Sequence, residues 1–417
     1  MKPSIPVTQP APHSLAQTIQ MKSVPAAQST FVSHLECSDC GTNYSPRTVH
    51  TFCPDCQAAL VTRYDLTSAR LRLDRDEMHA RPRGMWRWSE LLPVYDPANQ
   101  VTLGEGDTPT LSLPRLGSDL GLAHVFLKDE SSNPTGSFKA RGLAAAISKA
   151  RELGILKVII PTAGNAGGAM AAYAARAGIK AHIFMPKDTP RANIEESRMA
   201  GAEVVLVDGL ISEAAGMAGV KAHAEGWFDL STFKEPYRLE GKKIMGYEIA
   251  EAFEWQLPDV IIYPTGGGTG LVGIWKAIAE LTELGWLETD KRPRMVAVQA
   301  DGCAPVVKAF HAGADFCDFW TDAHTHASGL RVPKSFADRL ILSTLCESAG
   351  TAVSVSDKAI FQSQHEIATR EGLFVAPEGA ATLAALKELV QQKWVQPEER
   401  VLLLNTGSGL KYLDWAS

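Results

Sequence analysis

Residues 260–270 read VIIYPTGGGTG, an apolar run that is followed at once by a glycine-rich turn. The run Val260–Tyr263 is continuous and β-branched, as expected of a strand that is buried on both faces. The turn Thr265–Gly270 opens an apolar stretch at 270–284, which we expect to be a helix. A buried strand, a tight turn and a helix in this order are typical of α/β proteins.

The same unit recurs on both sides of this stretch. Apolar runs alternate with Ala-rich segments of helical length over most of the chain. We expect strands at 125–127, 158–160, 181–185 and 204–207, which are followed in turn by helices at 138–153, 167–177, 191–200 and 212–225. Two further strands are expected at 295–299 and 401–404. Such alternation predicts parallel sheets that are covered by helices, so the fold class is α/β.

Composition limits the function before any motif is considered. The chain has 417 residues, 45% hydrophobic and 21% charged, with 41 basic and 47 acidic residues and a formal charge of −6. That length predicts two or three domains, and the composition excludes widespread disorder. A mildly acidic chain disfavours a nucleic-acid partner, which requires a basic patch. Because neither a long apolar stretch nor a secretory signal is found, we expect a cytoplasmic protein without a membrane partner.

Four of the seven cysteines lie close together near the N-terminus. Residues 1–30 are rich in Pro, Ala, Ser, Gln and Thr, which predicts a flexible tail. Residues 31–64 then hold two CxxC pairs, formed by Cys37, Cys40, Cys53 and Cys56. Two such turns can converge on a tetrahedral Zn²⁺, so we predict a structural zinc ribbon over 31–64. A nucleic-acid-binding ribbon, a redox pair and a metal-free remnant are alternatives, and the other three cysteines are expected to be free buried thiols.

The segment Lys128–Gly142 reads KDESSNPTGSFKARG and holds a lysine in an informative position. Its Asn-Pro-Thr-Gly part predicts a turn, Ser137 is expected to cap a helix, and Lys139 then lies in the first helical turn. The positive end of the helix dipole lowers the pKa of an amine there. Since only a neutral amine attacks an aldehyde, Lys139 is a candidate Schiff-base lysine. Taken alone, it also fits an ordinary solvated lysine.

Three polar or glycine-rich turns follow predicted strands. Thr265–Gly270 offers backbone N–H groups at a helix N-terminus, which predicts a phosphate site, but its glycines match neither an ATP nor an NAD pattern. The turn at 162–168 offers N–H groups to a carboxylate and the Asn165 amide to a planar ring. The turn at 405–409 offers hydroxyls to an acceptor nitrogen. Each turn alone also fits a simple connection, but α/β proteins bind ligands where such turns meet.

Together these motifs resemble the fold-type-II pyridoxal-phosphate enzymes of the tryptophan synthase β-like superfamily, and most closely the threonine synthase group. The similarity rests on four stretches, 37–44 (CSDCGTNY), 104–109 (GEGDTP), 133–139 (NPTGSFK) and 236–242 (PYRLEGK). The resemblance implies a homodimer whose subunits bind pyridoxal 5′-phosphate between two α/β lobes. We expect a large lobe at 65–132 and 241–417 and a small mobile lobe at 133–240.

The resemblance also implies roles for individual residues. Lys139 is implied to bind the cofactor covalently and then to move protons. Asn165 is implied to contact the ring oxygen, and Thr406 the pyridine nitrogen. The cofactor phosphate is implied to bind the loop formed by Gly266, Gly267, Gly268, Thr269 and Gly270. The substrate carboxylate is implied to bind to Thr162, Ala163 and Gly164. The substrate phosphate is implied to bind to Arg238.

The implied activity is that of a lyase in threonine biosynthesis, which converts a small amino-acid substrate, O-phosphohomoserine, and water to threonine and phosphate. Three positions differ from the family pattern, Ala140, Ala166 and Phe233. A serine/threonine dehydratase or ammonia-lyase, an O-phosphoserine-dependent replacement enzyme and a non-enzymatic binding protein are the alternatives. Glu378 is expected to support the cofactor site or to cap a helix. Residues 128–130 are expected at the surface or behind the site.

Overall fold

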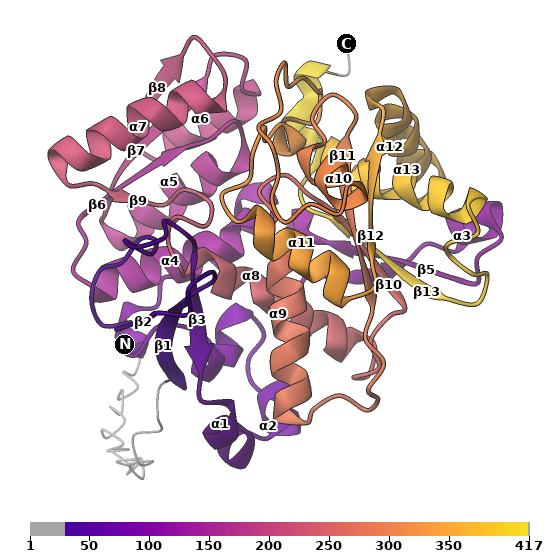
Figure 1. Ribbon diagram of the computed structural model, residues 1–417, viewed down its shortest axis with the longest axis horizontal. Helices are drawn as coiled ribbons and strands as arrows, with labels where there is room; N and C mark the ends of the chain where they lie inside the picture. Colours follow the sequence, from indigo (N-terminus) through magenta and orange to yellow (C-terminus); the bar gives the residue numbers. More distant parts are fainter. Residues whose placement is uncertain (1–29, 416–417) are drawn as a thin grey trace, which may run out of the picture.

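The computed structural model describes residues 30–415, which form two α/β units and a small antiparallel knuckle (Figure 1). The predicted tail at 1–30 lies outside the described residues except at its last position. Thr30 is buried, and its hydroxyl donates a hydrogen bond of 2.6 Å to the carbonyl oxygen of Leu92. Thr30 therefore belongs with the core and not with the predicted tail.

The larger sheet has the strand order β12-β11-β10-β13-β5-β4. Its strands are β4 (Thr110–Ser112), β5 (His124–Asp129), β10 (Val260–Pro264), β11 (Arg294–Ala300), β12 (Thr351–Val355) and β13 (Arg400–Asn405). All neighbours are parallel except the edge strand β4, which runs antiparallel to β5. Along β10, Val260 and Ile262 join one hydrophobic core while Ile261 and Tyr263 join another. This burial on both faces explains why the strands are continuous apolar runs.

The smaller sheet has the order β8-β7-β6-β9 and is parallel throughout. Its strands are β6 (Lys157–Pro161), β7 (Lys180–Pro186), β8 (Glu203–Val207) and β9 (Phe228–Asp229). Ile159 and Phe184 pack against α7 (Ile211–Glu225) on one face. Val158 and Ile160 join the core that includes the apolar residues of α4 on the other. The predicted α/β class with parallel sheets is confirmed, apart from the antiparallel strand β4.

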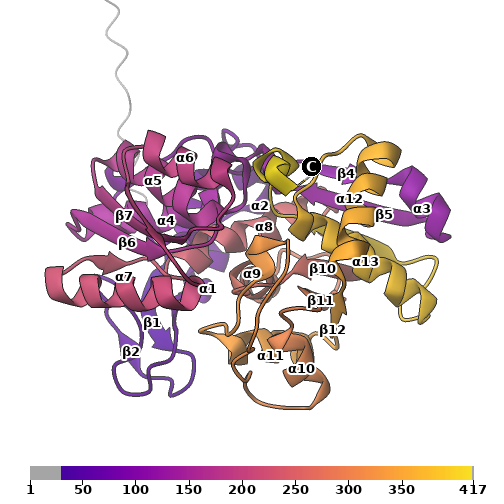
Figure 2. The ribbon, with the colours of Figure 1, turned by 90° about the horizontal axis from the view of Figure 1, so that it is seen from above.

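Helices cover both sheets, as Figures 1 and 2 show. Those that pack with the smaller sheet, besides α7, are α4 (Lys139–Glu152), α5 (Asn165–Ala177) and α6 (Arg191–Met199). One face of the larger sheet is covered by α3 (Pro114–Leu120), α12 (Asp357–Glu371) and α13 (Pro377–Gln391). Packed on its other face are α8 (Arg238–Ala252), α9 (Thr269–Leu284), α10 (Pro305–His311) and α11 (Asp338–Glu347). Short 3₁₀ helices are η1 (Met85–Leu91), η2 (Pro97–Asn99), η3 (Glu130–Ser132), η4 (Pro134–Gly136), η5 (Ser328–Leu330) and η6 (Gly409–Trp415).

The knuckle is a three-stranded antiparallel sheet in the order β2-β1-β3. Its strands are β1 (Val32–Cys37), β2 (Asn43–Tyr44) and β3 (Leu60–Tyr64), and it is followed by α1 (Leu66–Arg72) and α2 (Arg75–His79). The knuckle packs on the start of α8, where the Tyr64 hydroxyl donates a 2.8 Å hydrogen bond to Glu240. The smaller sheet falls within the predicted lobe at 133–240, but the lobe boundaries themselves stay predictions.

Candidate active site

A cavity of about 230 Å³ lies where β6, β10 and β13 end, and it collects the predicted site residues from distant parts of the chain. It is lined by Lys139, Thr162, Ala163, Gly164, Asn165, Gly266, Gly267, Gly268, Thr269, Gly270 and Thr406. These are all the residues predicted to hold the cofactor or the substrate carboxylate. They meet because the carboxyl ends of β10 and β13 in the larger sheet and of β6 in the smaller sheet face the same cavity.

Lys139 is the first residue of α4, and its amine faces this cavity. Burial is the main cause that lowers its pKa to about 7, and the nearby positive charge of Arg238 lowers it further. The negative charge of Glu378 acts in the opposite direction. A large fraction of Lys139 is therefore the neutral, nucleophilic amine near pH 7. The predicted direction of the pKa shift agrees with the structure, but burial rather than the helix dipole is its main cause.

Ser137 does not cap α4, so that prediction is wrong. The residue before the helix is Phe138, no side chain caps the helix, and Ser137 Oγ is buried without a hydrogen-bond partner among residues 30–415. The backbone holds this turn instead, because Phe138 N donates a 3.1 Å hydrogen bond to the carbonyl oxygen of Thr406. Ser137 and Gly407 also form an isolated β-bridge. The end of β13 thereby positions the helix that carries Lys139.

The glycine-rich loop after β10 has no room for side chains. A Cβ atom on Gly266 would overlap the carbonyl oxygen of Gly329, and one on Gly270 would overlap the Tyr263 hydroxyl. Gly268 has a φ of +76°, a left-handed conformation that glycine adopts without strain. The loop ends at Thr269, the first residue of α9, so its backbone N–H groups lie at a helix N-terminus. This arrangement fits a phosphate group.

Asn165 belongs to a chain of hydrogen bonds that sequence reasoning found only in part. Its Nδ2 lies 3.1 Å from the Tyr412 hydroxyl, which lies 3.1 Å from Glu378 Oε1. Glu378 also accepts a 2.7 Å hydrogen bond from the Gly329 N–H. Burial raises the pKa of Glu378. The expected support of the cofactor site by Glu378 thus has a structural basis, but Tyr412 was missed because nothing in its local sequence marks it.

Arg238 is the one predicted site residue that does not line the cavity. It is buried behind the segment that carries Ser231, Thr232 and Lys234, and these three side chains do line the cavity. Its Nη1 donates a hydrogen bond to the carbonyl oxygen of Leu230. Its Nε and Nη2 have no partner in the described part of the chain. Arg238 therefore places unsatisfied donors and a positive charge close to the site from behind its wall.

These features fit pyridoxal phosphate on structural grounds. The loop accepts a phosphate, and Lys139 presents an amine that is neutral near pH 7. Asn165 Oδ1 and Glu378 Oε2 are buried with no hydrogen-bond partner in the range 30–415, so the cavity offers polar atoms to a ring. Thr406 closes the cavity at the end of β13.

Comparison with known proteins agrees with this geometry. The profile of the family "pyridoxal-phosphate dependent enzyme" matches residues 101–407. The chain belongs to the pyridoxal-phosphate-dependent enzymes. The matched range begins after the knuckle and contains every residue predicted to bind the cofactor.

Individual proteins that are similar to this pyridoxal-phosphate-dependent enzyme give a finer comparison than the family as a whole. A threonine synthase of Methanosarcina acetivorans is 34% identical over 379 residues, which cover 91% of this chain and 92% of that protein. A threonine synthase of Methanocaldococcus jannaschii is 33% identical over 381 residues, covering 91% and 93%. Among solved structures, maize serine racemase has a TM-score of 0.64 at 23% identity, covering 72% of this chain and 88% of that one. That likeness shows the fold alone.

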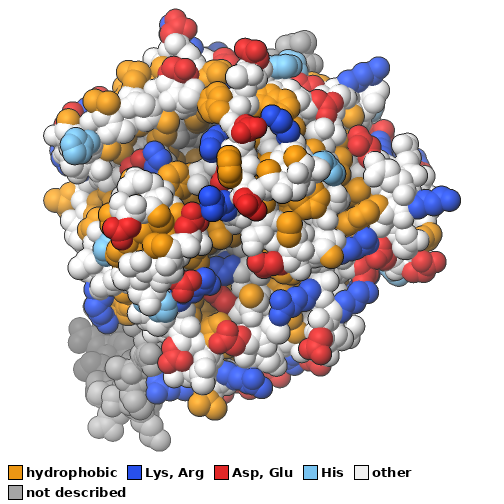
Figure 3. Space-filling view, viewed as in Figure 1, with side chains coloured by type: hydrophobic (Ala, Val, Ile, Leu, Met, Phe, Trp, Pro, Cys, Tyr) orange, Lys and Arg blue, Asp and Glu red, His pale blue; other side chains and the backbone are white. Residues whose placement is uncertain are grey.

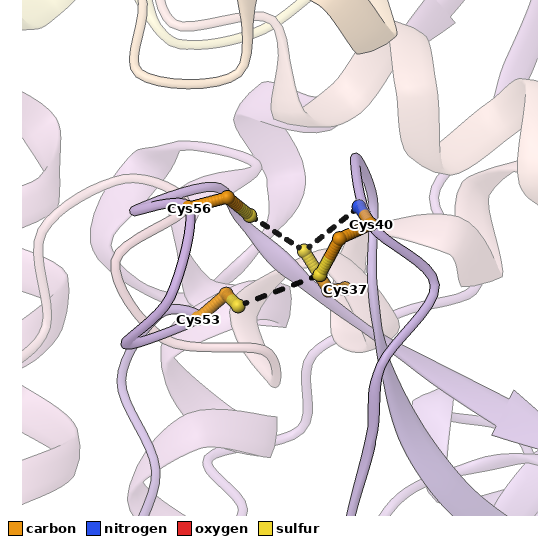
Figure 4. A group of neighbouring side chains, drawn as sticks. All are labelled: Cys37, Cys40, Cys53 and Cys56. Carbon is orange, nitrogen blue, oxygen red and sulfur yellow. Dashed lines mark hydrogen bonds between the residues drawn. The ribbon is translucent and has the colours of Figure 1, made fainter.

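The four clustered cysteines converge at the tip of the knuckle (Figure 4). Their Sγ atoms lie within 4.8 Å of one another, with 3.2 Å between Cys37 and Cys56 and 3.8 Å between Cys40 and Cys53. Four thiolates around one Zn²⁺ at about 2.3 Å lie about 3.8 Å apart. The donor set and its spacing therefore suit a tetrahedral metal. Of the other three cysteines, Cys346 is exposed, so the expectation that all three are buried is wrong for it.

Positive charge at the cavity comes from buried and from more exposed side chains, since Lys234, Arg331 and Lys334 line it besides Lys139. On the face shown in Figure 3, basic and acidic side chains are interspersed. Arg238, by contrast, is buried beside Lys139. Within the range 30–415 that the structure describes, the helices are too short or too polar to cross a bilayer.

Proposed function

We propose that this enzyme is a threonine synthase, which converts O-phosphohomoserine and water to threonine and phosphate. The observation that carries the proposal is the 34% identity to an archaeal threonine synthase over 91% of this chain and 92% of that one. The buried, partly unsatisfied Arg238 beside the cavity supports it, because a phosphorylated substrate requires positive charge there. Structural relatives with other activities share the fold, which does not define the substrate.

The chain's own residues supply binding and proton transfer. The N–H groups that open α5, after the Thr162–Gly164 turn, bind the substrate carboxylate. Lys139 Nζ accepts a proton at the substrate Cα and returns protons at later steps, for which a pKa of about 7 is suitable. Arg238 stabilises the phosphate that leaves from Cγ, and water then adds at Cβ. When bound, the cofactor supplies an electron-withdrawing ring that stabilises negative charge on the substrate.

A turnover assay tests the proposed substrate. Enzyme loaded with pyridoxal phosphate is expected to release threonine and inorganic phosphate in equal amounts from O-phosphohomoserine, measured by amino-acid analysis and phosphate colorimetry. O-Phosphoserine, serine and threonine are assayed in parallel. Formation of a keto acid from serine or threonine, without threonine from O-phosphohomoserine, would replace the proposal by a dehydratase.

The variant Arg238→Gln tests whether Arg238 contributes to recognition of the substrate phosphate. Because the positive charge behind the cavity wall is lost, we expect KM for O-phosphohomoserine to rise by about 10- to 100-fold. The exposed Arg198, which pairs with Glu195 on the surface, gives the matched control Arg198→Gln with unchanged kinetics. Unchanged KM in Arg238→Gln would contradict the assigned role.

We also propose that the Cys cluster binds a structural Zn²⁺. The purified enzyme is expected to contain about one zinc per chain by elemental analysis. Cys53→Ser removes a buried ligand, so we expect loss of the metal and a lower unfolding temperature. Cys346→Ser changes an exposed thiol outside the cluster and should affect neither. Full zinc content in Cys53→Ser would exclude this site. The homodimer and the cytoplasmic location stay predictions.

A further inference from the structure

Lys242 is a buried cation whose charge is not balanced by a carboxylate of the described chain. It lies on α8 and has no exposed surface. Its ammonium donates a hydrogen bond to Thr269 Oγ1, and no carboxylate between residues 30 and 415 lies within ion-pair distance of it. The adjacent Lys243 is equally buried but has Glu240 at 2.8 Å and Glu280 at 2.9 Å. Because a buried charge requires a partner, an anion that binds nearby would stabilise the protonated form of Lys242.

The groups that face Lys242 are mostly positive. Burial, followed by the charges of Arg238 and Lys139, holds the pKa of Lys242 well below its usual value. Glu235 acts in the opposite direction. However, the Glu235 carboxylate already accepts the backbone N–H groups of Tyr237 at 2.7 Å and of Arg238 at 3.0 Å. Three basic side chains therefore share one occupied carboxylate, and a bound dianion would favour the protonated form of Lys242.

The close packing of α8 against α9 places Lys242 directly behind the glycine-rich loop. Gly246 of α8 has no room for a Cβ, which would overlap Ala277 of α9. Gly273 of α9 likewise lies close to the backbone of α8. This approach brings Lys242 against Thr269, which begins α9 and lines the cavity.

The direction of this hydrogen bond has a chemical consequence. When Lys242 is protonated, its ammonium group has three donor hydrogens and no acceptor, so Thr269 Oγ1 is the acceptor. The hydroxyl hydrogen of Thr269 is then directed away from Lys242 and is available to a second acceptor. Since Thr269 lines the cavity at the phosphate loop, that acceptor can be an oxygen of a bound phosphate.

We propose that Lys242 is a positioning residue for the phosphate group of pyridoxal phosphate. Its charge lies behind the loop Gly266–Gly270, and its hydrogen bond orients the Thr269 hydroxyl toward the phosphate. The proposal depends on membership of the pyridoxal-phosphate-dependent family and not on the substrate proposed above. If the proposed role of Lys242 is wrong, the proposed threonine synthase activity is unaffected.

Binding of two cofactor forms to the apoenzyme tests this role. Lys242→Met keeps the length of the side chain but removes its charge. Its Kd for pyridoxal phosphate, measured by absorbance titration, is expected to rise by about 10- to 100-fold. Its Kd for pyridoxal, which has no phosphate, should stay within about twofold of the wild-type value. Lys308→Met, at an exposed ion pair with Asp318, is the matched control and should change neither Kd.

A second pair of variants removes the hydroxyl instead of the charge. Thr269→Ala should weaken pyridoxal phosphate selectively, and Thr269→Ser, which keeps the hydroxyl, should restore binding. Inorganic phosphate should raise the unfolding temperature of the wild-type apoenzyme more than that of Lys242→Met. An equal loss of affinity for both cofactor forms, or unchanged affinity for pyridoxal phosphate, would overturn the proposal. If Lys242→Met does not fold, Thr269→Ala and Thr269→Ser test the proposal through the same comparison of Kd values for pyridoxal phosphate and pyridoxal.

Discussion

Lys139→Ala should lower turnover by about three orders of magnitude or more, because it removes both the covalent attachment of the cofactor and the base at the substrate. The side chain begins α4, lines the cavity and has a lowered pKa. Borohydride reduction of the loaded wild-type enzyme should fix the cofactor on the peptide that contains Lys139. Peptide mass spectrometry measures this label directly.

The control for this variant is an exposed lysine that does not line the cavity. Lys187 is exposed and pairs with Asp208, so Lys187→Ala should keep wild-type turnover and the same labelled peptide. Lys242 is a stringent competitor, because it is also buried near the loop and also has a lowered pKa. A label on Lys242 instead of Lys139 would refute the assignment.

The pKa of Lys139 predicts how covalent capture of the cofactor depends on pH. Its value of about 7 means that the amine is protonated below pH 7 and neutral above it. The capture rate of the apoenzyme should therefore rise through pH 7 and then level off, whereas an ordinary lysine would show a rise up to about pH 10.4. Arg238→Gln removes one of the causes of the shift, so it should move the midpoint to higher pH. Stopped-flow absorbance follows both rates.

The sequence predicted seven of the ten strands of the two larger sheets, and missed β4, β9 and β12, because the signal of a buried strand is local. Strands such as β10 are buried on both faces and are therefore continuous apolar runs. Helix α8 gave no such signal, since it is buried on nearly all sides and still carries five charged residues in its buried stretch. Three of them, Glu240, Lys243 and Glu248, form ion pairs with residues on other elements. Amphipathic periodicity cannot reveal a helix whose polar residues are buried by long-range pairing.

The site shows the same division between local and long-range information. The glycine loop and the Lys139 turn have their determinants within a few residues, so motif spacing was sufficient to find them. Arg238 was found as a motif residue, but its position behind the cavity wall depends on how α8 packs. Lys128 and Glu130, expected at the surface or behind the site, are both fully buried. Only the fold shows that they belong to a charged network.

That network leads to the second large effect, a loss of stability in Arg141→Met. Arg141, in the first turn of α4, has no exposed surface and contacts Glu130 Oε2 and Glu248 Oε1 at 2.6 Å each. Lys128 adds a second cation at 2.9 Å from Glu248. Removing Arg141 leaves two buried carboxylates with one cation, which should cost about 3–5 kcal/mol in the free energy of unfolding. Urea denaturation, followed by circular dichroism, measures this cost.

The matched control is the exposed pair Arg370–Asp119, because solvent screens it. Arg370→Met should cost no more than about 1 kcal/mol. The dependence on pH gives an independent check. Burial alone would raise the pKa of Glu248, but Arg141 and Lys128 overcome that effect and hold it far below its usual range. Its stabilising contribution is therefore present above the unfolded-state pKa of about 4.3 and is lost as the pH falls below it. The difference in free energy of unfolding between wild type and Glu248→Gln should therefore shrink in acid. Equal losses of stability in Arg141→Met and Arg370→Met would show that the buried network does not act as a unit.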